Sequence, residues 1–462
     1  MPINMPLFIK ISFLWFCFFS LASQAALVSP PGTIVSYVGP NGSQNSQLLL
    51  TPASTLKVIT ATAAIKQLGA DYRFNTQVSV KPNPEGLHLR LHMRGDPSFT
   101  SQDLKSLLAQ VTKGFGKKVA SITIDEGVFS GHTRSQGQVW NDIGICFASP
   151  VSALNIDSNC VNGNLKPGEL GQLSKLHVSD TQLLSIDNQI TTVSREHQDC
   201  EQSLIVGDNN QYQLKGCINQ NARMMPLRFS INDEQQYFTL KLRRVLRQLG
   251  VTYQGKISYR TQLSEYDSTF SHRSVPLIDL VEFMLVESDN LTADSLFKTI
   301  AVEQQRAGSY QAASELVKQQ LTELGLDLSY TALRDGSGLS RENLVSAELL
   351  YNLLELWLID PDLTPLIYKL PVAGVSGTLK YRRSVTRPPL KAHIHAKSGY
   401  VNGVINLVGF IEKQGQMTPF VFMTNGVSLN EQQTKALRQR QIIHPVLGYE
   451  RDWLKQQLAA IK

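Results

Sequence analysis

Apolar residues recur with helical spacing in two separate parts of the chain. In residues 51–68 they include Leu56, Ile59 and Ile65, and Gly69 follows the pattern, which predicts a buried helix. The same spacing returns after about residue 265. We expect four more helices there, over residues 276–286, 293–305, 310–324 and 346–358.

A different pattern occupies the stretch between these helical parts. Residues 70–260 contain short runs of alternating apolar and polar residues, such as 87–93 and 120–124, which Gly, Asn, Asp and Pro interrupt. Such runs are typical of strands, so we expect this stretch to be mainly β.

Strand patterns also mark the last part of the chain. Three runs predict strands, at residues 393–398, 404–411 and 418–423. Asn402-Gly403 separates the first two and favours a tight hairpin, and a final helix is expected from Glu431. The order of elements predicts an α/β (α+β) domain, an antiparallel sheet flanked by helices, which a large insertion interrupts.

Composition and the N-terminal segment together indicate an exported globular protein. The 462 residues are 42% hydrophobic and 18% charged, enough for two or three domains. Lys10, a short apolar run and Ser23-Gln24-Ala25 predict a signal peptide over residues 1–25. A membrane anchor is the alternative, but the run is short for a span of about 20 residues. The net charge of +6 is mild, and no basic cluster suggests nucleic acid.

Four cysteines follow the signal segment, and all lie in the expected insertion: Cys146, Cys160, Cys200 and Cys217. An even number in an exported protein predicts two disulfides. The sequence leaves three pairings open, and short loops favour Cys146 with Cys160 and Cys200 with Cys217, each stabilising by about 3 kcal/mol. A zinc site is the rival, but no CxxC or HxxxH spacing supports it.

Ser54 and Lys57, at the start of the first predicted helix, could supply a nucleophile and its base. A serine hydroxyl needs a nearby base, and a lysine one helical turn away can act as one if burial or a cation lowers its pKa. The helix N-terminus also favours developing negative charge. The spacing alone is weak evidence, since it recurs at Ser295 and Lys298, where we expect a helix with an exposed lysine.

A second motif, Ser288-Asp289-Asn290, lies between two predicted helices. There a serine could relay a proton and an amide could bind a substrate peptide group. Other SxN matches occur in the chain, and Asp289-Asn290 could simply cap the following helix.

A third motif, Lys397-Ser398-Gly399, lies on a predicted strand and is the chain's only K-[ST]-G sequence. An edge strand can pair with an extended peptide, and a glycine lets that peptide approach closely.

In this order the three motifs resemble the active-site trio of penicillin-binding proteins and class A β-lactamases. The sequence resembles in particular the penicillin-binding protein 4 or D-Ala-D-Ala carboxypeptidase C family, peptidase family S13. The resemblance covers nearly all of the chain after the signal segment. It rests on residues 52–60, 95–98, 287–290, 335–341, 370–374 and 396–399.

The resemblance implies a serine β-lactamase/transpeptidase-like catalytic domain, formed by residues 26–68 and 262–462. It also implies that residues 69–261, between the SxxK and SxN motifs, form an inserted accessory region. Because that family carries two extra domains at this point, we expect two nested, mainly β domains.

The same resemblance implies the catalytic roles. Ser54 would be the nucleophile and Lys57 its general base. Ser288 and Lys397 would relay a proton to the leaving D-alanine.

The implied substrate contacts involve neighbouring residues. Asn290 would bind the substrate amide, and Lys397 with Ser398 would hold the terminal carboxylate beside Gly399. Backbone N–H groups of Ser54 and Tyr400 would form the oxyanion hole. Arg341 could bind a substrate carboxylate or face water.

The activity implied is that of a D-Ala-D-Ala carboxypeptidase and D,D-endopeptidase, which cuts peptidoglycan stem peptides and binds β-lactam antibiotics covalently. A periplasmic location follows from the family. No cofactor is expected, and no metal, because His393 and His395 share a strand face without a third ligand. Membrane contact would be peripheral at most, and a homodimer stays open.

Two other functions compete with this one. A serine β-lactamase would need a glutamate to activate the deacylating water, and Glu287 is adjacent to Ser288 in sequence. A catalytically silent wall-binding scaffold could keep the fold, but loss of activity should have altered Ser54 or Lys57.

Overall fold

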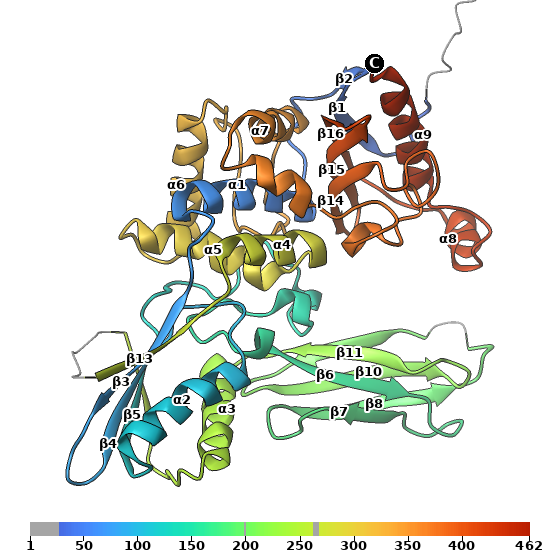
Figure 1. Ribbon diagram of the computed structural model, residues 1–462. Coiled ribbons are helices and arrows are strands. Elements are labelled where there is room, and N and C mark those ends of the chain that lie inside the picture. Colours follow the sequence, from blue (N-terminus) through green and yellow to red (C-terminus); the bar gives the residue numbers. More distant parts are fainter. Residues whose placement is uncertain (1–26, 198–199, 262–267) are drawn as a thin grey trace, which may run out of the picture.

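The computed structural model describes residues 27–197, 200–261 and 268–462, so the predicted signal peptide lies outside the described residues. Figure 1 shows two parts. One contains the sheet of strands β1, β2 and β14–β16 with helices around it, and the other contains the inserted strands.

The sheet of the first part has five strands in the order β14-β15-β16-β1-β2. The strands are β1 (Ile34–Gly39), β2 (Gly42–Gln44), β14 (Ile394–Val401), β15 (Val404–Lys413) and β16 (Gln416–Asn425). The three strands predicted near the C-terminus are confirmed, with Val401 opposite Val404 across the hairpin. The sequence analysis missed β1, which pairs with the distant β16 and places Ile34 opposite Asn425.

Helices cover both faces of this sheet. On one face lie α1 (Lys57–Leu68), α4 (Leu277–Glu287), α5 (Asn290–Glu303), α6 (Tyr310–Glu323) and α7 (Ala347–Ile359), which confirms the five helices predicted. The expected last helix is two helices, α8 (Glu431–Arg438) and α9 (Pro445–Ala460).

Alternate residues of β16 pack into the two cores. Val421 and Met423 join the helical core, whereas Phe420 and Phe422 pack against Trp453 of α9, with ring centroids 6.0 and 5.3 Å away. Burying each large apolar side chain stabilises the fold by roughly 1.5–3 kcal/mol. The sheet is therefore covered on both faces, and β14 lies at its edge.

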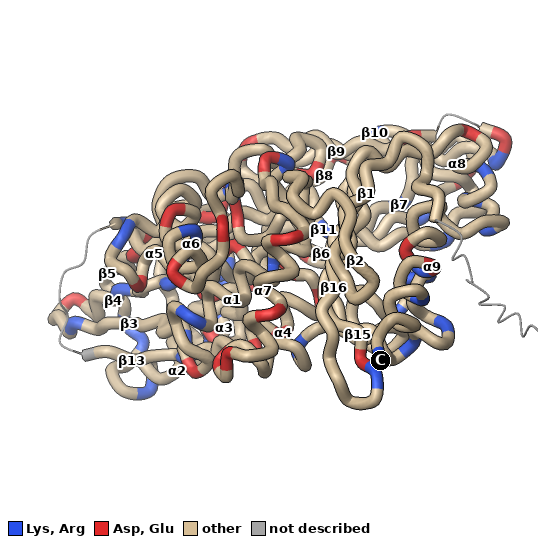
Figure 2. The backbone as a smooth tube through the Cα atoms, turned by 90° about the horizontal axis from the view of Figure 1, so that it is seen from above, with Lys and Arg blue, Asp and Glu red and all other residues tan. Residues whose placement is uncertain are grey.

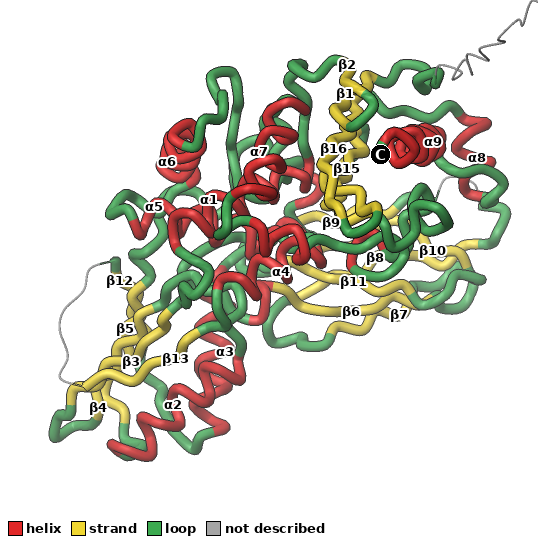
Figure 3. Tube along the Cα trace, turned by 45° about the horizontal axis from the view of Figure 1, so that its top comes forward, coloured by secondary structure: helices red, strands yellow, loops and turns green. Residues whose placement is uncertain are grey.

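The inserted region begins and ends in a second sheet, ordered β12-β5-β4-β3-β13. Its strands are β3 (Asn75–Lys81), β4 (Leu87–His92), β5 (Val119–Asp125), β12 (Ile257–Arg260) and β13 (Ser268–Arg273). Helices α2 (Ser101–Phe115) and α3 (Glu234–Gln248), which the sequence analysis did not predict, pack beside it (Figure 3). β13 pairs with β3 although it lies in the range expected for the catalytic domain.

Between β5 and α3 the chain forms two three-stranded sheets, ordered β11-β6-β7 and β8-β10-β9. They contain β6 (Cys160–Lys166), β7 (Lys175–Val178), β8 (Ser185–Val193), β9 (Gln202–Val206), β10 (Gln211–Asn219) and β11 (Met225–Ser230). The disulfides are Cys146–Cys160 and Cys200–Cys217, the pairing that the sequence analysis favoured.

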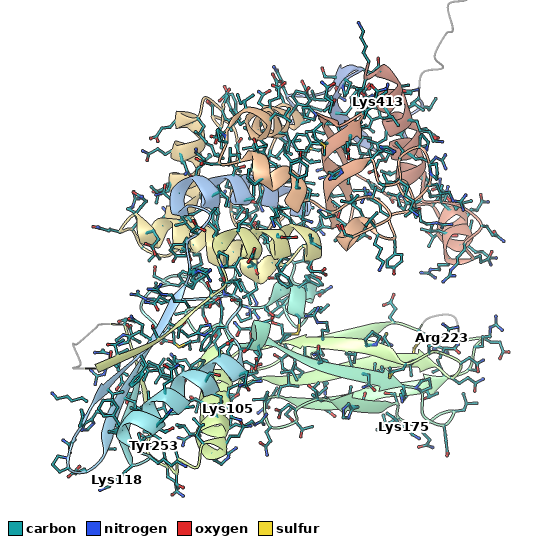
Figure 4. The ribbon with its side chains drawn as sticks, viewed as in Figure 1. Lys105, Lys118, Lys175, Arg223, Tyr253 and Lys413 are labelled. Carbon is teal, nitrogen blue, oxygen red and sulfur yellow. A yellow bond between two sulfur atoms is a disulfide. The ribbon has the colours of Figure 1, made fainter. Side chains whose placement is uncertain are left out.

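Charged residues of both signs are interspersed along both parts of the molecule (Figure 2). Lys118, Lys175 and Arg223 of the inserted region project outward (Figure 4). In the part of the chain that the structure describes, no helix has the length and apolar character needed to cross a membrane.

Candidate active site

Three distant segments meet at the edge of the main sheet. Ser54 lies in a short 3-10 turn, Ala53–Leu56, which continues directly into α1. Ser288 and Asp289 separate α4 from α5, and Lys397 lies on the edge strand β14, which contacts the 3-10 turn. The three predicted motifs thus come together in space.

Lys57 holds its amine directly beside the Ser54 hydroxyl. Its side chain is fully buried, and Nζ lies 3.1 Å from Ser54 Oγ. Nζ also donates to Asn290 Oδ1 at 2.6 Å and to the Ser337 carbonyl oxygen at 2.7 Å. Because those two oxygens can only accept, they fix two N–H groups and leave the third position of the nitrogen for Ser54. An uncharged Lys57 can therefore accept the Ser54 proton.

A second lysine–serine pair lies on the other side of the site. Lys397, also fully buried, donates from Nζ to Ser288 Oγ at 2.8 Å and to its neighbour's carbonyl oxygen, that of Ser398, at 3.0 Å. This places a second hydroxyl and amine close enough to pass a proton between them.

Burial determines the protonation of both lysines. It lowers the pKa of Lys57, although the neighbouring carboxylates, Asp294 first, raise it in part. The pKa of Lys397 is held well below its ordinary value, mainly by burial and further by the charges of Lys57 and Arg382. Both shifts favour the free amine, the form that a base or proton relay needs.

Asn290 connects this group to the inserted region. Its Oδ1 accepts from Lys57, and its Nδ2 donates to the Phe147 carbonyl oxygen at 2.7 Å. Phe147 is next to the disulfide-bonded Cys146. The orientation of the Asn290 amide thus depends on a loop that no motif indicated.

Gly399 lets β14 lie directly against the turn that carries Ser54. A Cβ at this position would lie 2.7 Å from the Pro52 carbonyl oxygen and 3.1 Å from Thr55 Cγ2. No other residue type would leave the strand where it is. Asn406 of β15, which is fully buried, donates to the same Pro52 oxygen at 2.9 Å and so fixes the position of the turn.

The remaining predicted residues lie along β14 and its hairpin. Ser398 Oγ donates to Thr378 Oγ1 at 2.7 Å, so a second hydroxyl, which the sequence analysis missed, lies beside it. The Tyr400 side chain is 73% exposed. Arg341 Nη1 donates to the Asn402 carbonyl oxygen at 2.7 Å, which places this guanidinium near the end of the strand.

Two residues next to the site have left-handed backbone conformations. Ala53, directly before Ser54, has φ 49°, and Ser288 has φ 60°. Such conformations cost of order 1–3 kcal/mol outside glycine and cluster at functional sites. Here they accompany the placement of Ser54 Oγ beside the Lys57 amine and of Ser288 Oγ beside the Lys397 amine.

The second SxxK sequence differs from expectation. Lys298 is not exposed but buried between the rings of Phe129 and Tyr310, with Nζ 5.0 Å from each centroid. Burial lowers its pKa to about 8. It donates to backbone carbonyls of the inserted region, so it joins the two parts of the molecule.

His395 contacts Glu412, with Nε2 3.2 Å from Oε2. Within residues 27–197, 200–261 and 268–462 no group of at least three His, Cys, Asp or Glu side chains is arranged to hold a metal ion.

A buried lysine beside a serine, a second serine–lysine pair and an adjacent edge strand, on a sheet flanked by helices, define a serine hydrolase of the β-lactamase/transpeptidase-like fold. The chain belongs to the D-Ala-D-Ala carboxypeptidase 3 (S13) family, whose model matches residues 41–444.

Individual relatives agree with this family. The chain is 34% identical over 443 residues to D-alanyl-D-alanine carboxypeptidase DacB of Haemophilus influenzae, covering 92% of this chain and 91% of that protein. It is 26% identical to the D-alanyl-D-alanine carboxypeptidase of Actinomadura sp., over 82% of this chain and 74% of that one. The crystal structure of penicillin-binding protein 4 (dacB) from Haemophilus influenzae matches with TM-score 0.84 and 32% identity, covering 92% and 97% of the two chains.

Proposed function

We propose that the protein is a serine-type D-alanyl-D-alanine carboxypeptidase that cuts peptidoglycan stem peptides through an acyl-enzyme on Ser54. The observation that carries this proposal is the contact of Lys57 Nζ, fully buried, with Ser54 Oγ at 3.1 Å. Family membership and the named relatives support the same reaction.

In the acylation step, Ser54 Oγ bonds to the carbonyl carbon of the penultimate D-alanine, and its proton passes to Lys57 Nζ. The backbone N–H groups of Ser54 and Tyr400 stabilise the oxyanion. As the C–N bond breaks, the proton that Lys57 accepted passes through Ser288 and Lys397 to the departing amine of the last D-alanine, which leaves both lysines uncharged again. Water then hydrolyses the ester and releases the shortened peptide.

We assign the substrate contacts to residues beside the two lysine–serine pairs, as the family resemblance implies. Asn290 binds the substrate amide through its Nδ2, which in the free protein donates to Phe147. Lys397 and Ser398 hold the terminal carboxylate, and Thr378 adds a second hydroxyl beside Ser398. Gly399 leaves room for an extended peptide along β14, and Arg341 lies at the far end of that path.

The penultimate D-alanine of a D-Ala-D-Ala stem and the D-alanine of a D-alanyl crosslink present the same acyl group, so we also assign D,D-endopeptidase activity to this site. β-Lactams carry a strained amide in place of the scissile bond, and we expect them to acylate Ser54. A Haemophilus influenzae penicillin-binding protein 4 that is 30% identical to this chain has been crystallised with a β-lactam.

The predicted signal peptide and the two disulfides support export to an oxidising compartment, which in this family is the periplasm.

Glu287 does not support the β-lactamase alternative, because its side chain is exposed at the end of α4.

Turnover of a pentapeptide ending in D-Ala-D-Ala tests the proposal. The purified protein should release one D-alanine per peptide, and Ser54→Ala should release none. D-Alanine release by Ser54→Ala at the wild-type rate would contradict the assignment of Ser54.

A further inference from the structure

A buried carboxyl group lies behind Lys57 and has no part in the reaction just described. Asp294 is on α5, one helical turn after Asn290, and is 2% exposed. Burying a carboxylate is costly unless hydrogen bonds and cations compensate for lost water. The contacts of Asp294 therefore indicate what it does.

Asp294 holds the loop that binds Lys57. Its Oδ1 accepts from the Gly336 backbone N–H at 2.9 Å, and the next residue, Ser337, supplies the carbonyl oxygen that accepts from Lys57 at 2.7 Å. The Tyr310 hydroxyl of α6 donates to Asp294 Oδ2 at 3.4 Å. Asp294 thus fixes one of the two oxygens that orient the Lys57 amine.

The rest of this loop is fixed independently. Asp335 accepts from the N–H groups of Gly338 and Ser340, from Asn343 Nδ2 and from Ser135 Oγ of the inserted region, at 2.7–2.9 Å. A Cβ on Gly338, whose φ is +79°, would lie 1.9 Å from the Ala53 carbonyl oxygen. The loop therefore packs in close contact with the turn that carries Ser54.

Asp294 and Lys57 also influence one another's charge. Burial, then the charge of Asp335, raises the pKa of Asp294, and Lys57 opposes this shift. A charged Asp294 raises the pKa of Lys57, as Asp335 and Asp289 do to a smaller extent. Lys298 of the same helix and the Tyr310 hydroxyl are further titratable groups that interact with Asp294. An uncharged Asp294 therefore favours an uncharged Lys57.

We propose that Asp294 is a positioning residue for Lys57. Asp294 holds the Ser337 carbonyl against the Lys57 amine, and its own charge determines how readily that amine is free to accept the Ser54 proton. This inference rests on the proposed roles of Ser54 and Lys57. It also gives a function to residues 335–340, which otherwise contribute no group to the reaction.

The pH dependence of acylation tests this role. The second-order rate constant for a fluorescent penicillin should fall at acid pH as Lys57 becomes protonated. Asp294→Asn keeps an oxygen for the Gly336 N–H but removes the charge, so the pKa of Lys57 falls. The acid limb of the profile should then move to lower pH by about one unit, as expected for loss of one nearby buried charge.

Tyr310→Phe provides a second variant that retains the ring. Loss of its hydroxyl removes a donor to Asp294, which favours the protonated carboxyl, so the limb should shift in the same direction by less. Asp96→Asn is the matched control. Asp96 is also 2% exposed and its pKa is also raised by burial, but it lies in the inserted region, away from Lys57.

An unchanged acid limb in a folded Asp294→Asn protein would overturn the proposal, and so would an equal shift in Asp96→Asn. If Asp294→Asn does not fold, an unchanged limb in Tyr310→Phe overturns it. Failure of the wild-type protein to acylate at Ser54 would instead reject the proposed function, so the two results are distinguishable.

Discussion

At the scale of single residues, the reactivity proposed for each amine depends on how many of its hydrogen-bond partners are fixed. Lys57 has two oxygens that can only accept and one hydroxyl that can donate, and burial lowers its pKa. The same lysine in water would be charged and unable to take a proton at neutral pH. We infer that position and burial together, rather than the SxxK spacing alone, suit it to act as a base.

Lys57→Gln should therefore lower the rate of penicillin acylation by about 10²–10⁴, the usual contribution of a general base. Stopped-flow or gel-based labelling of Ser54 measures the rate. Lys241→Gln is the matched control, because it removes another largely buried lysine, whose Nζ pairs with Asp157 Oδ2 at 2.6 Å in the inserted region and does not contact Ser54. It should lower stability but leave labelling within about threefold; equal losses in the two variants would show that the Lys57 effect is structural.

Thr378→Val should weaken binding of peptides that end in a free carboxylate, because Thr378 Oγ1 lies 2.7 Å from Ser398 Oγ. Hydrogen bonds to charged groups contribute about 1.5–3 kcal/mol, so KM should rise about tenfold or more. KM for the corresponding D-alaninamide peptide should change little, and Thr378→Ser should restore the wild-type value. Equal effects on acid and amide would exclude a contact with the carboxylate.

The sequence predicted the motif residues that the structure brings together, because each motif occupies an identifiable helix start, loop or strand. It did not predict Thr378, Phe147 or Asp294, which reach the site from segments without a motif. Lys298 was expected to be exposed, because a lysine in a helix usually faces water. Its burial between two rings depends on the packing of the inserted region, which periodicity does not reveal.

At the scale of elements, the site depends on how closely β14 approaches the start of α1. Gly399 allows this approach, and Asn406 holds the turn from the neighbouring strand. A displacement of about 1 Å at such a point can reduce a rate roughly 100-fold.

Gly399→Ala should accordingly reduce acylation about 100-fold while the protein stays folded, as penicillin labelling and thermal unfolding would show. Gly114→Ala on α2 is the control, since a Cβ there makes an ordinary contact, 3.6 Å from Phe270 Cζ. That variant should keep full activity and gain about 0.5–1 kcal/mol of stability. Full activity in Gly399→Ala would mean that the close approach is not required.

Most helices and strands around the site were predictable from periodicity. β1 was not, because only its pairing with β16 at the other end of the chain makes it part of the sheet. Helix α2 was missed although its signals are present, namely the capping box of Thr100 and Asp103 and the buried Leu104, Leu107, Leu108 and Val111. The strand-like runs on either side led the whole stretch to be interpreted as mainly β.

At the scale of the whole molecule, the insertion is part of the site. We propose that it consists of two nested units, the five-stranded sheet with α2 and α3 and, between β5 and α3, the strands β6–β11. The connection into β6 carries Phe147, which holds Asn290, and Ser135, which holds Asp335. The inserted region thus contacts Asn290 and Asp335 directly, although none of the three active-site motifs lies in it.

The two disulfides should consequently differ in their effect on activity. Replacing Cys146 and Cys160 by Ser should lower acylation about tenfold, because the loop that presents the Phe147 carbonyl loses its covalent anchor. The same change at Cys200 and Cys217 should leave acylation unchanged. Each pair should cost about 2–4 kcal/mol of stability, measurable by denaturant unfolding. Equal acylation by both double variants would argue against control of Asn290 by this loop.

The mass of the intact protein before and after benzylpenicillin, with peptide mapping of any adduct, tests whether Ser54 forms the acyl-enzyme. We expect one stable adduct per chain, on the peptide that contains Ser54, and no adduct on Ser54→Ala. Absence of an adduct without hydrolysis of the drug would favour the silent scaffold, and rapid hydrolysis without a stable adduct would favour a β-lactamase. Either result would contradict the assignment of a carboxypeptidase that acts through a Ser54 acyl-enzyme.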